Sequence, residues 1–382
     1  MALLPSRPSH PSRPSHPSRR RTGAAAVFAA AIALTSALQS VPATARPATG
    51  PAPGPAVGIG CGTTVGRVPL DTTYNPATGR YELTDATRGN HRTYDMQGAA
   101  TGTGVLVTDD DNVWCEGGRQ SDAVAAHYVH AVFWDYYRQV HGRSGIRGDG
   151  RAGCSRVHYR SAYTNAFYDH TNLCITYGDG PSPYGPLTRI DVGVHEMAHG
   201  VTASTADLSF YGEAAALNEA TSDIFAAAAE FHAANPADPG DYLVAEQPPD
   251  INGEKPPLRH MDRPSKDGRS KDYWYSGINR IDPHYASGPA NHFFYLLAEG
   301  SGPKIINNVR YDSPTYDGKP VTGIGRRAAE RIWFKALTER MTSNTDYHKA
   351  RTATLAAAAV LHGADSAEYK AVDAAWAAVN VT

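Results

Sequence analysis

A short segment of the chain carries residues that could bind a metal ion and use it to activate water. The sequence reads His195-Glu196-Met197-Ala198-His199, so two histidines stand four positions apart and a glutamate follows the first. On a helix both imidazoles lie on one face and can reach one ion, with the Glu196 carboxylate beside it. Zinc suits two neutral imidazoles and a carboxylate, with a fourth position left for water. Because a chain with 16 histidines can produce this pattern by chance, the surrounding residues must decide.

A second helix, predicted over residues 218–234, carries three carboxylates on one face. At 100° per residue, Glu219, Asp223 and Glu230 fall within about 40° of one another. Ile224, Phe225 and a run of alanines leave little polar surface on this helix, which argues against a solvated acidic stripe. Buried carboxylates need partners of opposite charge, so this helix is expected to face cations.

Glu219 is the expected third zinc ligand. Another zinc-peptidase pattern places Gly and a third His three and six residues after the second His, but here those positions hold Thr202 and Thr205. Asp223 is expected to accept the free N–H of His195 and to fix its tautomer, as residues behind metal ligands do. Glu196 is the candidate base that takes a proton from the attacking water.

The elements around these residues indicate an α+β fold with two lobes. From about residue 58 to 180, short β-like runs alternate with Gly, Asn and Asp turns, and one helix interrupts them near residues 122–141. Helical patterns then dominate, at about 191–203, 218–234, 286–299, 323–341, 345–361 and 366–378. We expect a β-rich lobe over 58–203, which includes the His-Glu-x-x-His helix, and an α-helical lobe over 204–382, with the active site between them.

Residues 1–45 have the order of a secretory signal and are not expected to join the fold. A low-complexity stretch of Pro, Ser, Arg and His precedes Arg19-Arg20-Arg21, an apolar run over 23–38, and Ala43-Thr44-Ala45. Cleavage after about Ala45 is expected, and a transmembrane anchor is less favoured because the run is short. Sec and twin-arginine export both stay open. Residues 46–57 are predicted to be a short linker or minimal pro-segment.

Charge and cysteine content restrict the partners and the compartment. The net charge of −2 gives no reason to expect nucleic acid or an anionic membrane as a partner. In an exported protein the four cysteines favour two disulfides over free thiols. Cys154 and Cys174 flank two strand-like runs, and a bridge across that predicted hairpin leaves Cys61 to pair with Cys115. We therefore expect a secreted, extracellular protein that does not contact a membrane after signal cleavage.

Over residues 58–382 these motifs resemble the thermolysin family of secreted zinc metallopeptidases, which are gluzincins and neutral metalloproteinases. In that family Asn-Glu-Ala-x-Ser-Asp follows the His-Glu-x-x-His helix at the spacing of residues 218–223. Asn165 and Ala166 resemble the edge-strand residues that hold the substrate backbone. Arg259 resembles the arginine that holds a substrate carbonyl, and His284 resembles the transition-state histidine.

The resemblance implies an endopeptidase that prefers a bulky apolar residue after the scissile bond. It is expected to act on protein or peptide substrates as a monomer. His284, kept charged by Asp282, is the implied donor to the oxyanion. Relatives usually add a tyrosine there, but the matching position holds Phe210, with Tyr211 next to it. Either Tyr211 reaches the substrate or His284 works alone. In some family members the carboxylate partner of this histidine stands at a different position, and that position holds Asn279 here.

The resemblance also implies a structural calcium ion. Asp191, Glu230 and Asp238, with a carbonyl near Gly240, resemble the main calcium site of the family, and hard oxygen ligands suit Ca²⁺. Two-calcium relatives use further acids at positions that hold Gly240 and Leu243 here, so one ion is expected. Two alternatives to a general endopeptidase are a processing protease of narrow specificity and a zinc-bound but inactive scaffold. Intact Glu196 argues against the scaffold, because a structural site needs no base.

Overall fold

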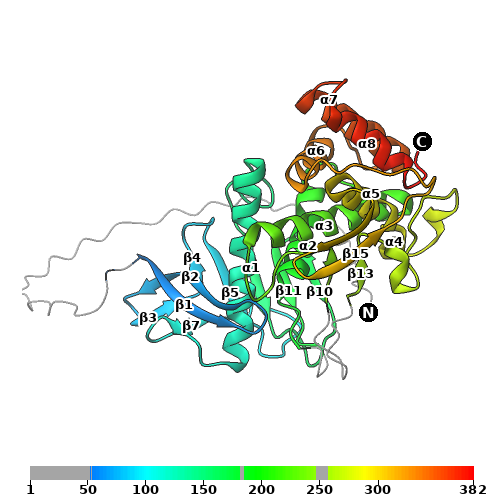
Figure 1. Ribbon diagram of the computed structural model, residues 1–382. Coiled ribbons are helices and arrows are strands. Elements are labelled where there is room, and N and C mark those ends of the chain that lie inside the picture. Colours follow the sequence, from blue (N-terminus) through cyan, green and yellow to red (C-terminus); the bar gives the residue numbers. More distant parts are fainter. Residues whose placement is uncertain (1–51, 53, 181–184, 247–256) are drawn as a thin grey trace, which may run out of the picture. The chain divides into compact units, whose positions relative to one another are not determined.

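The computed structural model of the protein describes residue 52 and residues 54–180, 185–246 and 257–382 (Figure 1). The predicted signal over 1–45 lies outside the described residues. The predicted linker over residues 46–57 was wrong at its carboxyl end, because the first strand, β1 (Gly54–Gly62), already begins at Gly54. Its residues pair with β2 in an antiparallel ladder that starts at Gly54 and Tyr74, so residues 54–57 belong to the sheet. None of the helices within the described ranges is long and apolar enough to cross a membrane.

The amino-terminal lobe contains two sheets. The first has the order β7-β3-β2-β1-β8, and the second has the order β10-β11-β9-β5-β4, with β6 paired to β5. Besides β1, the strands are β2 (Gly66–Asn75), β3 (Arg80–Glu82), β4 (Thr84–Asp85), β5 (His91–Asp95), β6 (Val105–Leu106), β7 (Thr108–Asp109), β8 (Val113–Trp114), β9 (Cys154–Val157), β10 (Ala166–Asp169) and β11 (Cys174–Tyr177). The prediction of a β-rich amino-terminal lobe is confirmed.

Both predicted disulfides are present, but one strand arrangement was wrong. Cys61 bonds to Cys115 and Cys154 to Cys174. The expected hairpin between the Cys154 and Cys174 runs does not form, because β9 and β11 are parallel neighbours with these two cysteines in register. The chain between them returns as β10, which pairs antiparallel with β11. The disulfide therefore links parallel strands, and the hairpin lies between β10 and β11.

Three helices connect the sheets to the carboxyl-terminal lobe (Figure 1). They are α1 (Gly118–His141), α2 (Ile190–Ala203) and α3 (Gly212–Ala233). Aromatic residues of α1 lie in the core, and Phe133 and Tyr137 are fully buried. In α2 a Cβ at Gly193 would collide with the Tyr177 hydroxyl and one at Gly200 with Ile146, so both glycines permit close packing. These contacts fix the α2 face that carries the histidines.

The helix α3 begins earlier than predicted. Its first residue is Gly212 rather than residue 218, and Tyr211 is its N-cap residue. Gly212 has φ of +62°, a conformation that glycine adopts without steric cost. Every residue from Ala214 to Glu230 is buried, so the burial expected of the acidic face is confirmed.

The rest of the carboxyl-terminal lobe is mainly helical, as predicted. Its elements are β12 (Leu243–Val244), β13 (Arg259–His260), η1 (Pro264–Asp267), η2 (Ile278–Arg280), α4 (Pro283–Ala286), α5 (Gly288–Glu299), β14 (Gly302–Ile306), β15 (Val309–Ser313), α6 (Arg326–Glu339), α7 (Tyr347–His362) and α8 (Ala367–Ala377). The single helix expected at 286–299 is preceded by the separate short helix α4. Asp282 caps α4 by accepting the N–H of His284, which places that histidine at the start of the turn.

Candidate metal centre

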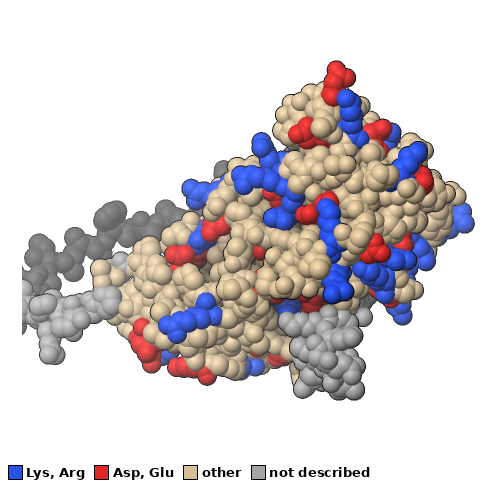
Figure 2. All heavy atoms as spheres, viewed as in Figure 1, with Lys and Arg blue, Asp and Glu red and all other residues tan. Residues whose placement is uncertain are grey.

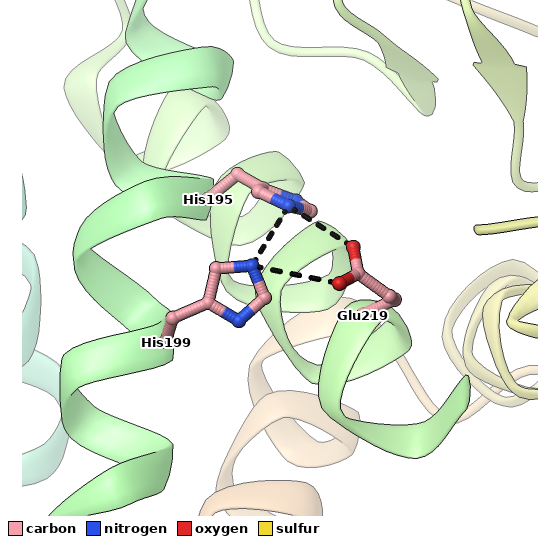
Figure 3. A group of neighbouring side chains, drawn as sticks. All are labelled: His195, His199 and Glu219. Carbon is pink, nitrogen blue, oxygen red and sulfur yellow. Dashed lines mark hydrogen bonds and ion pairs between the residues drawn. The ribbon is translucent and has the colours of Figure 1, made fainter. Parts of the chain in front are cut away.

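Two helices bring three candidate zinc ligands together. His195 and His199 lie one turn apart on α2, and Glu219 faces them from α3 (Figure 3). The Nε2 atoms of the two histidines are 3.2 Å apart. Glu219 Oε2 lies 3.4 Å from His195 Nε2, and its Oε1 lies 3.8 Å from His199 Nε2. All three side chains are buried.

These separations fit a tetrahedral zinc ion. Ligand atoms about 2.1 Å from zinc at tetrahedral angles are about 3.4 Å from one another. The observed separations of 3.2, 3.4 and 3.8 Å bracket that value. Glu219 Oε2 is also buried without a hydrogen-bond partner, which is costly unless a cation is bound. The residues present therefore fit the metal that the sequence predicts.

Asp223 lies behind His195 and connects it to the carboxyl-terminal lobe. Its Oδ1 is 2.8 Å from His195 Nδ1, as the sequence predicts. Arg259 donates to both oxygens of Asp223, at 2.7 and 2.8 Å, and Asn291 donates to Oδ2 at 2.8 Å. Although burial acts in the opposite sense, Arg259 and His195 hold the pKa of Asp223 far below its usual range. A permanently charged Asp223 keeps a proton on His195 Nδ1 and leaves Nε2 to face the metal.

Asn218 orients the second histidine, a role that sequence reasoning missed. Its Oδ1 lies 2.9 Å from His199 Nδ1, and its Nδ2 donates to the Leu208 carbonyl at 3.0 Å. Because the amide nitrogen is held by a carbonyl, Oδ1 must accept from His199, which leaves Nε2 free for the metal. The position of Asn218 directly before Glu219 was the signal that could have found it.

The two histidines have opposite pKa shifts. Burial works against a charged His195, but Asp223 and Glu219 outweigh it and raise the pKa of His195 to about 10. Burial lowers the pKa of His199 to about 4; His195 adds to this shift, and Glu219 and the hydrogen bond to Asn218 oppose it. Despite burial, His284 and His199 lower the pKa of Glu219 to about 2. A cation between the three side chains would replace the proton of His195.

Glu196 lies between the ligands in sequence and is itself buried. Burial raises its pKa to about 8, and the charge of Glu219 adds to the shift, while His195, Arg259 and the backbone N–H of Tyr168 oppose it. A carboxylate with so high a pKa has a strong affinity for a proton near neutral pH, which suits a general base. The hydrogen bond from Tyr168 ties Glu196 to β10.

His284 and Asp282 face the centre from α4. The Nδ1 atom of His284 is 2.7 Å from Asp282 Oδ1, and its Nε2 is 3.4 Å from Glu219 Oε2. His284 Nε2 is buried without a hydrogen-bond partner. With Asp282 at one nitrogen, the other nitrogen can donate to an oxygen that carries negative charge.

The remaining predicted substrate residues occupy different environments. Asn165 immediately precedes β10, and its buried Oδ1 has no hydrogen-bond partner; Ala166 is the first residue of β10 and pairs with Tyr177. Arg259 donates from Nε and Nη2 to Asp223, a contact that sequence reasoning did not predict. Tyr211 is 82% exposed, whereas Phe210 is 41% exposed.

A second acidic group lies where α2, α3 and the segment after β12 meet. Asp191, Glu230 and Glu246 bring carboxylate oxygens within 4.8 Å of one another. Asp238 Oδ2 is buried without a hydrogen-bond partner, and burial together with the charges of Asp191 and Asp241 raises the pKa of Asp238 to about 7. Glu246 was missed by sequence reasoning, and burial raises its pKa to about 9.

The predicted carbonyl ligand near this group already has a donor. The Gly240 carbonyl accepts from Asn307 Nδ2 at 2.7 Å, although a carbonyl oxygen has a second lone pair. Glu230 Oε2 accepts the N–H of Asp241 at 3.0 Å. A cluster of buried carboxylates with few cationic partners is the donor set that Ca²⁺ takes.

Comparisons with known proteins identify the family and the fold of this chain. The model of the thermolysin metallopeptidase catalytic domain matches residues 57–203, and that of the thermolysin metallopeptidase alpha-helical domain matches residues 206–381. Together the two matches span both lobes and define the fold as that of the thermolysin metallopeptidases. The chain belongs to the thermolysin family.

Individual relatives agree with this assignment. The chain is 58% identical over 319 residues to the transglutaminase-activating metalloprotease of Streptomyces mobaraensis, an alignment that covers 83% of this chain and 41% of that protein. It is 36% identical over 330 residues to thermolysin of Alicyclobacillus acidocaldarius subsp. acidocaldarius, covering 85% of this chain and 57% of the relative. The chain thus spans about half the length of these curated relatives.

A solved structure is also similar. The precursor of protealysin, a metalloproteinase from Serratia proteamaculans, superposes with a TM-score of 0.57 and 25% sequence identity. The alignment covers 76% of this chain and 87% of that chain. The two-lobed thermolysin-like fold expected from the sequence is confirmed.

Proposed function

We propose that the protein is a secreted zinc endopeptidase that hydrolyses peptide bonds by attack of an activated water. The observation that carries the proposal is the buried set of His195, His199 and Glu219, with Glu196 beside it. The set has the separations of tetrahedral zinc ligands. A purely structural zinc site needs no base, so buried Glu196 favours catalysis.

The chain's own residues then divide the chemical work. When bound, zinc would polarise the scissile carbonyl and increase the acidity of the attacking water. Glu196 takes the proton from that water and later delivers one to the leaving amine. His284, with Asp282 at its other nitrogen, donates to the developing oxyanion. Asn165 and Ala166 hold the substrate backbone along β10, and Arg259 holds a substrate carbonyl, which fixes the reacting geometry.

The substrate preference proposed is a bulky apolar residue after the scissile bond. Val192 on α2 is buried close to the ligands in sequence, and Leu258, directly before β13, is partly buried against the core. Both side chains are apolar and suit a pocket for such a residue.

Secretion and calcium binding complete the proposal. Two disulfides support an extracellular location. One structural calcium ion is proposed at Asp191, Glu230 and Asp238, with Glu246 as a further ligand. We propose lobes over 58–203 and 204–382, and a protein that works as a monomer on protein or peptide substrates.

Casein hydrolysis by the purified protein tests the proposed function. We expect hydrolysis to stop when 1,10-phenanthroline removes zinc and to return when zinc is restored. The Glu196→Gln variant should bind one zinc ion, measured by elemental analysis, yet lose hydrolysis by on the order of 1000-fold or more. The Glu116→Gln variant changes an exposed glutamate and should retain full activity. Equal rates for wild type and Glu196→Gln would contradict the enzyme proposal.

A further inference from the structure

A cavity lies next to the elements of the metal centre, and apart from Leu258 its lining residues have no role in the mechanism above. Its volume is about 390 Å³, and its lining includes Leu258, His260, Lys266, Arg269 and Tyr285. The cavity shares two elements with the metal centre, because His260 follows Arg259 on β13 and Tyr285 follows His284 on α4. In the view of Figure 2, basic side chains gather at the side of the molecule where Figure 1 shows α4.

The arrangement of β13 explains why the cavity and the metal centre are separate. Adjacent residues of a strand point to opposite sides. Arg259 therefore turns towards Asp223, whereas its neighbour His260 lines the cavity. A peptide whose carbonyl is held by Arg259 would pass over this strand as it leaves the metal centre.

The cavity offers hydrogen-bond donors with N–H groups that remain free. The Arg269 guanidinium lies over the Tyr285 ring, with Cζ 5.4 Å from the ring centroid, and donates to the Tyr285 hydroxyl at 2.5 Å. Among the described residues, this neutral hydroxyl is its only side-chain hydrogen-bond partner. His260 Nδ1 is buried without a partner. Lys266 gives one N–H to Asp262 at 2.6 Å and has two more.

The carboxylate among the described lining residues, Asp267, is already engaged. Asp267 Oδ1 accepts the backbone N–H groups of Arg269 and Ser270, and its Oδ2 accepts the Ser270 hydroxyl. Asp262 Oδ2 accepts from Lys266 and from the backbone N–H of Asp312. Asp262 Oδ1 is buried without a hydrogen-bond partner, but Asp262 is not among the described lining residues. The described lining therefore has free donors, and both oxygens of its carboxylate, Asp267, are occupied. A carboxylate is the ligand that matches this set, and a guanidinium binds it with two parallel hydrogen bonds.

We propose that this cavity is a subsite for an acidic side chain of the substrate, two or three residues after the scissile bond, and that Arg269 determines this specificity. The inference rests on the proposed function, because it uses the direction in which a substrate held by Arg259 continues. Arg269 is exposed and makes no contact with the zinc ligands or with Glu196, so its replacement should leave the chemical step unchanged.

Peptides that differ only in Glu or Gln at these two positions test the subsite. We expect wild type to have a kcat/KM about fivefold higher for Glu peptides, through KM, with a preference that weakens as salt is added. Arg269→Gln should abolish the preference, Arg269→Lys should keep part of it, and Arg269→Glu should favour a Lys peptide instead. Arg340→Gln changes an exposed arginine after α6 and should behave as wild type.

An unchanged Glu-to-Gln ratio in Arg269→Gln would overturn the subsite while leaving the proposed function intact. If wild type cleaves none of the peptides, the proposed function fails, and calorimetric binding of the same peptides decides the subsite separately. A Glu preference in binding that Arg269→Gln removes supports the subsite. Equal affinity of wild type for Glu and Gln peptides overturns it.

Discussion

Asn218 tests whether the metal centre depends on residues behind its ligands. Asn218→Ala removes the acceptor of the His199 Nδ1–H, so the ring loses the contact that fixes its tautomer and orientation. We expect zinc affinity to fall about 10-fold to 100-fold, measured by competition with a chelator of known affinity. Asn380 donates to the Trp274 carbonyl away from the centre. Unchanged zinc affinity in Asn218→Ala, or an equal loss in Asn380→Ala, would contradict the assigned role.

The oxyanion side of the centre can be tested with Phe210 and Tyr211. A hydroxyl that donates to the oxyanion contributes on the order of 100-fold in kcat. Because Tyr211 is 82% exposed, we expect Tyr211→Phe to change kcat by less than about twofold, with His284 working alone. Phe210→Tyr restores the phenol usual in relatives and should raise kcat. A loss of about 100-fold in Tyr211→Phe would show instead that this side chain turns inward when substrate binds.

At the scale of elements, β5 and α1 are joined by three buried histidines. His91 and His130 stack with ring centroids 3.5 Å apart, and His127 Nδ1 lies 2.9 Å from Thr93 Oγ1. Burial lowers the pKa of all three, that of His130 to about 3. His130 and His127 lower the pKa of His91 further, and His127 does the same for His130. Asp85 raises the pKa of His127 and His130, whereas Arg88 lowers it.

This cluster predicts acid sensitivity of the amino-terminal lobe. The histidines are neutral when folded but take up protons near pH 6.5 when unfolded, so their stabilising effect is full above about pH 6.5 and is lost as the pH falls towards 3. Each contributes a slope of up to about 1.4 kcal/mol per pH unit in that range. Replacing His130 by Phe should reduce the slope of the free energy of unfolding by about one such contribution.

Urea unfolding between pH 6.5 and 4.5 measures this slope. All proteins should carry Glu196→Gln to prevent self-digestion. His348→Asn changes an exposed histidine and should keep the original slope. If His130→Phe keeps it as well, the buried cluster does not cause the acid sensitivity.

At the scale of the whole molecule, the proposed calcium ion would stabilise contacts among α2, α3 and the segment after β12. An ion that binds only the folded state adds about 2.7 kcal/mol of stability at a free concentration 100 times its Kd. We expect EGTA to lower the midpoint of thermal unfolding and calcium to restore it. Glu246→Gln should weaken this calcium response, whereas Glu116→Gln should preserve it. A thermal midpoint independent of calcium would remove the ion from the proposal.

Local sequence patterns predicted much of the metal centre. Helical spacing alone placed His195 and His199 on one face of the first helix. It also placed Glu219 and Asp223 on one face of the second helix, because a helix fixes which residues are neighbours. The cysteine pairing and the two-lobed order of elements were also predictable. The parallel pairing of β9 with β11 was not, because strand direction depends on the path of the chain between them.

The sequence by itself determined the candidate ligands and the base, since these depend on spacing within single helices. It also determined the class of fold, which follows from the order of β-like and helical segments along the chain. Only the tertiary structure decided which residues support them. Arg259 and Asn291 on Asp223, Glu246 beside Asp191, and Arg269 over Tyr285 each join segments far apart in the chain. Such contacts carry no periodic signal, because they arise when packed elements bring distant side chains together.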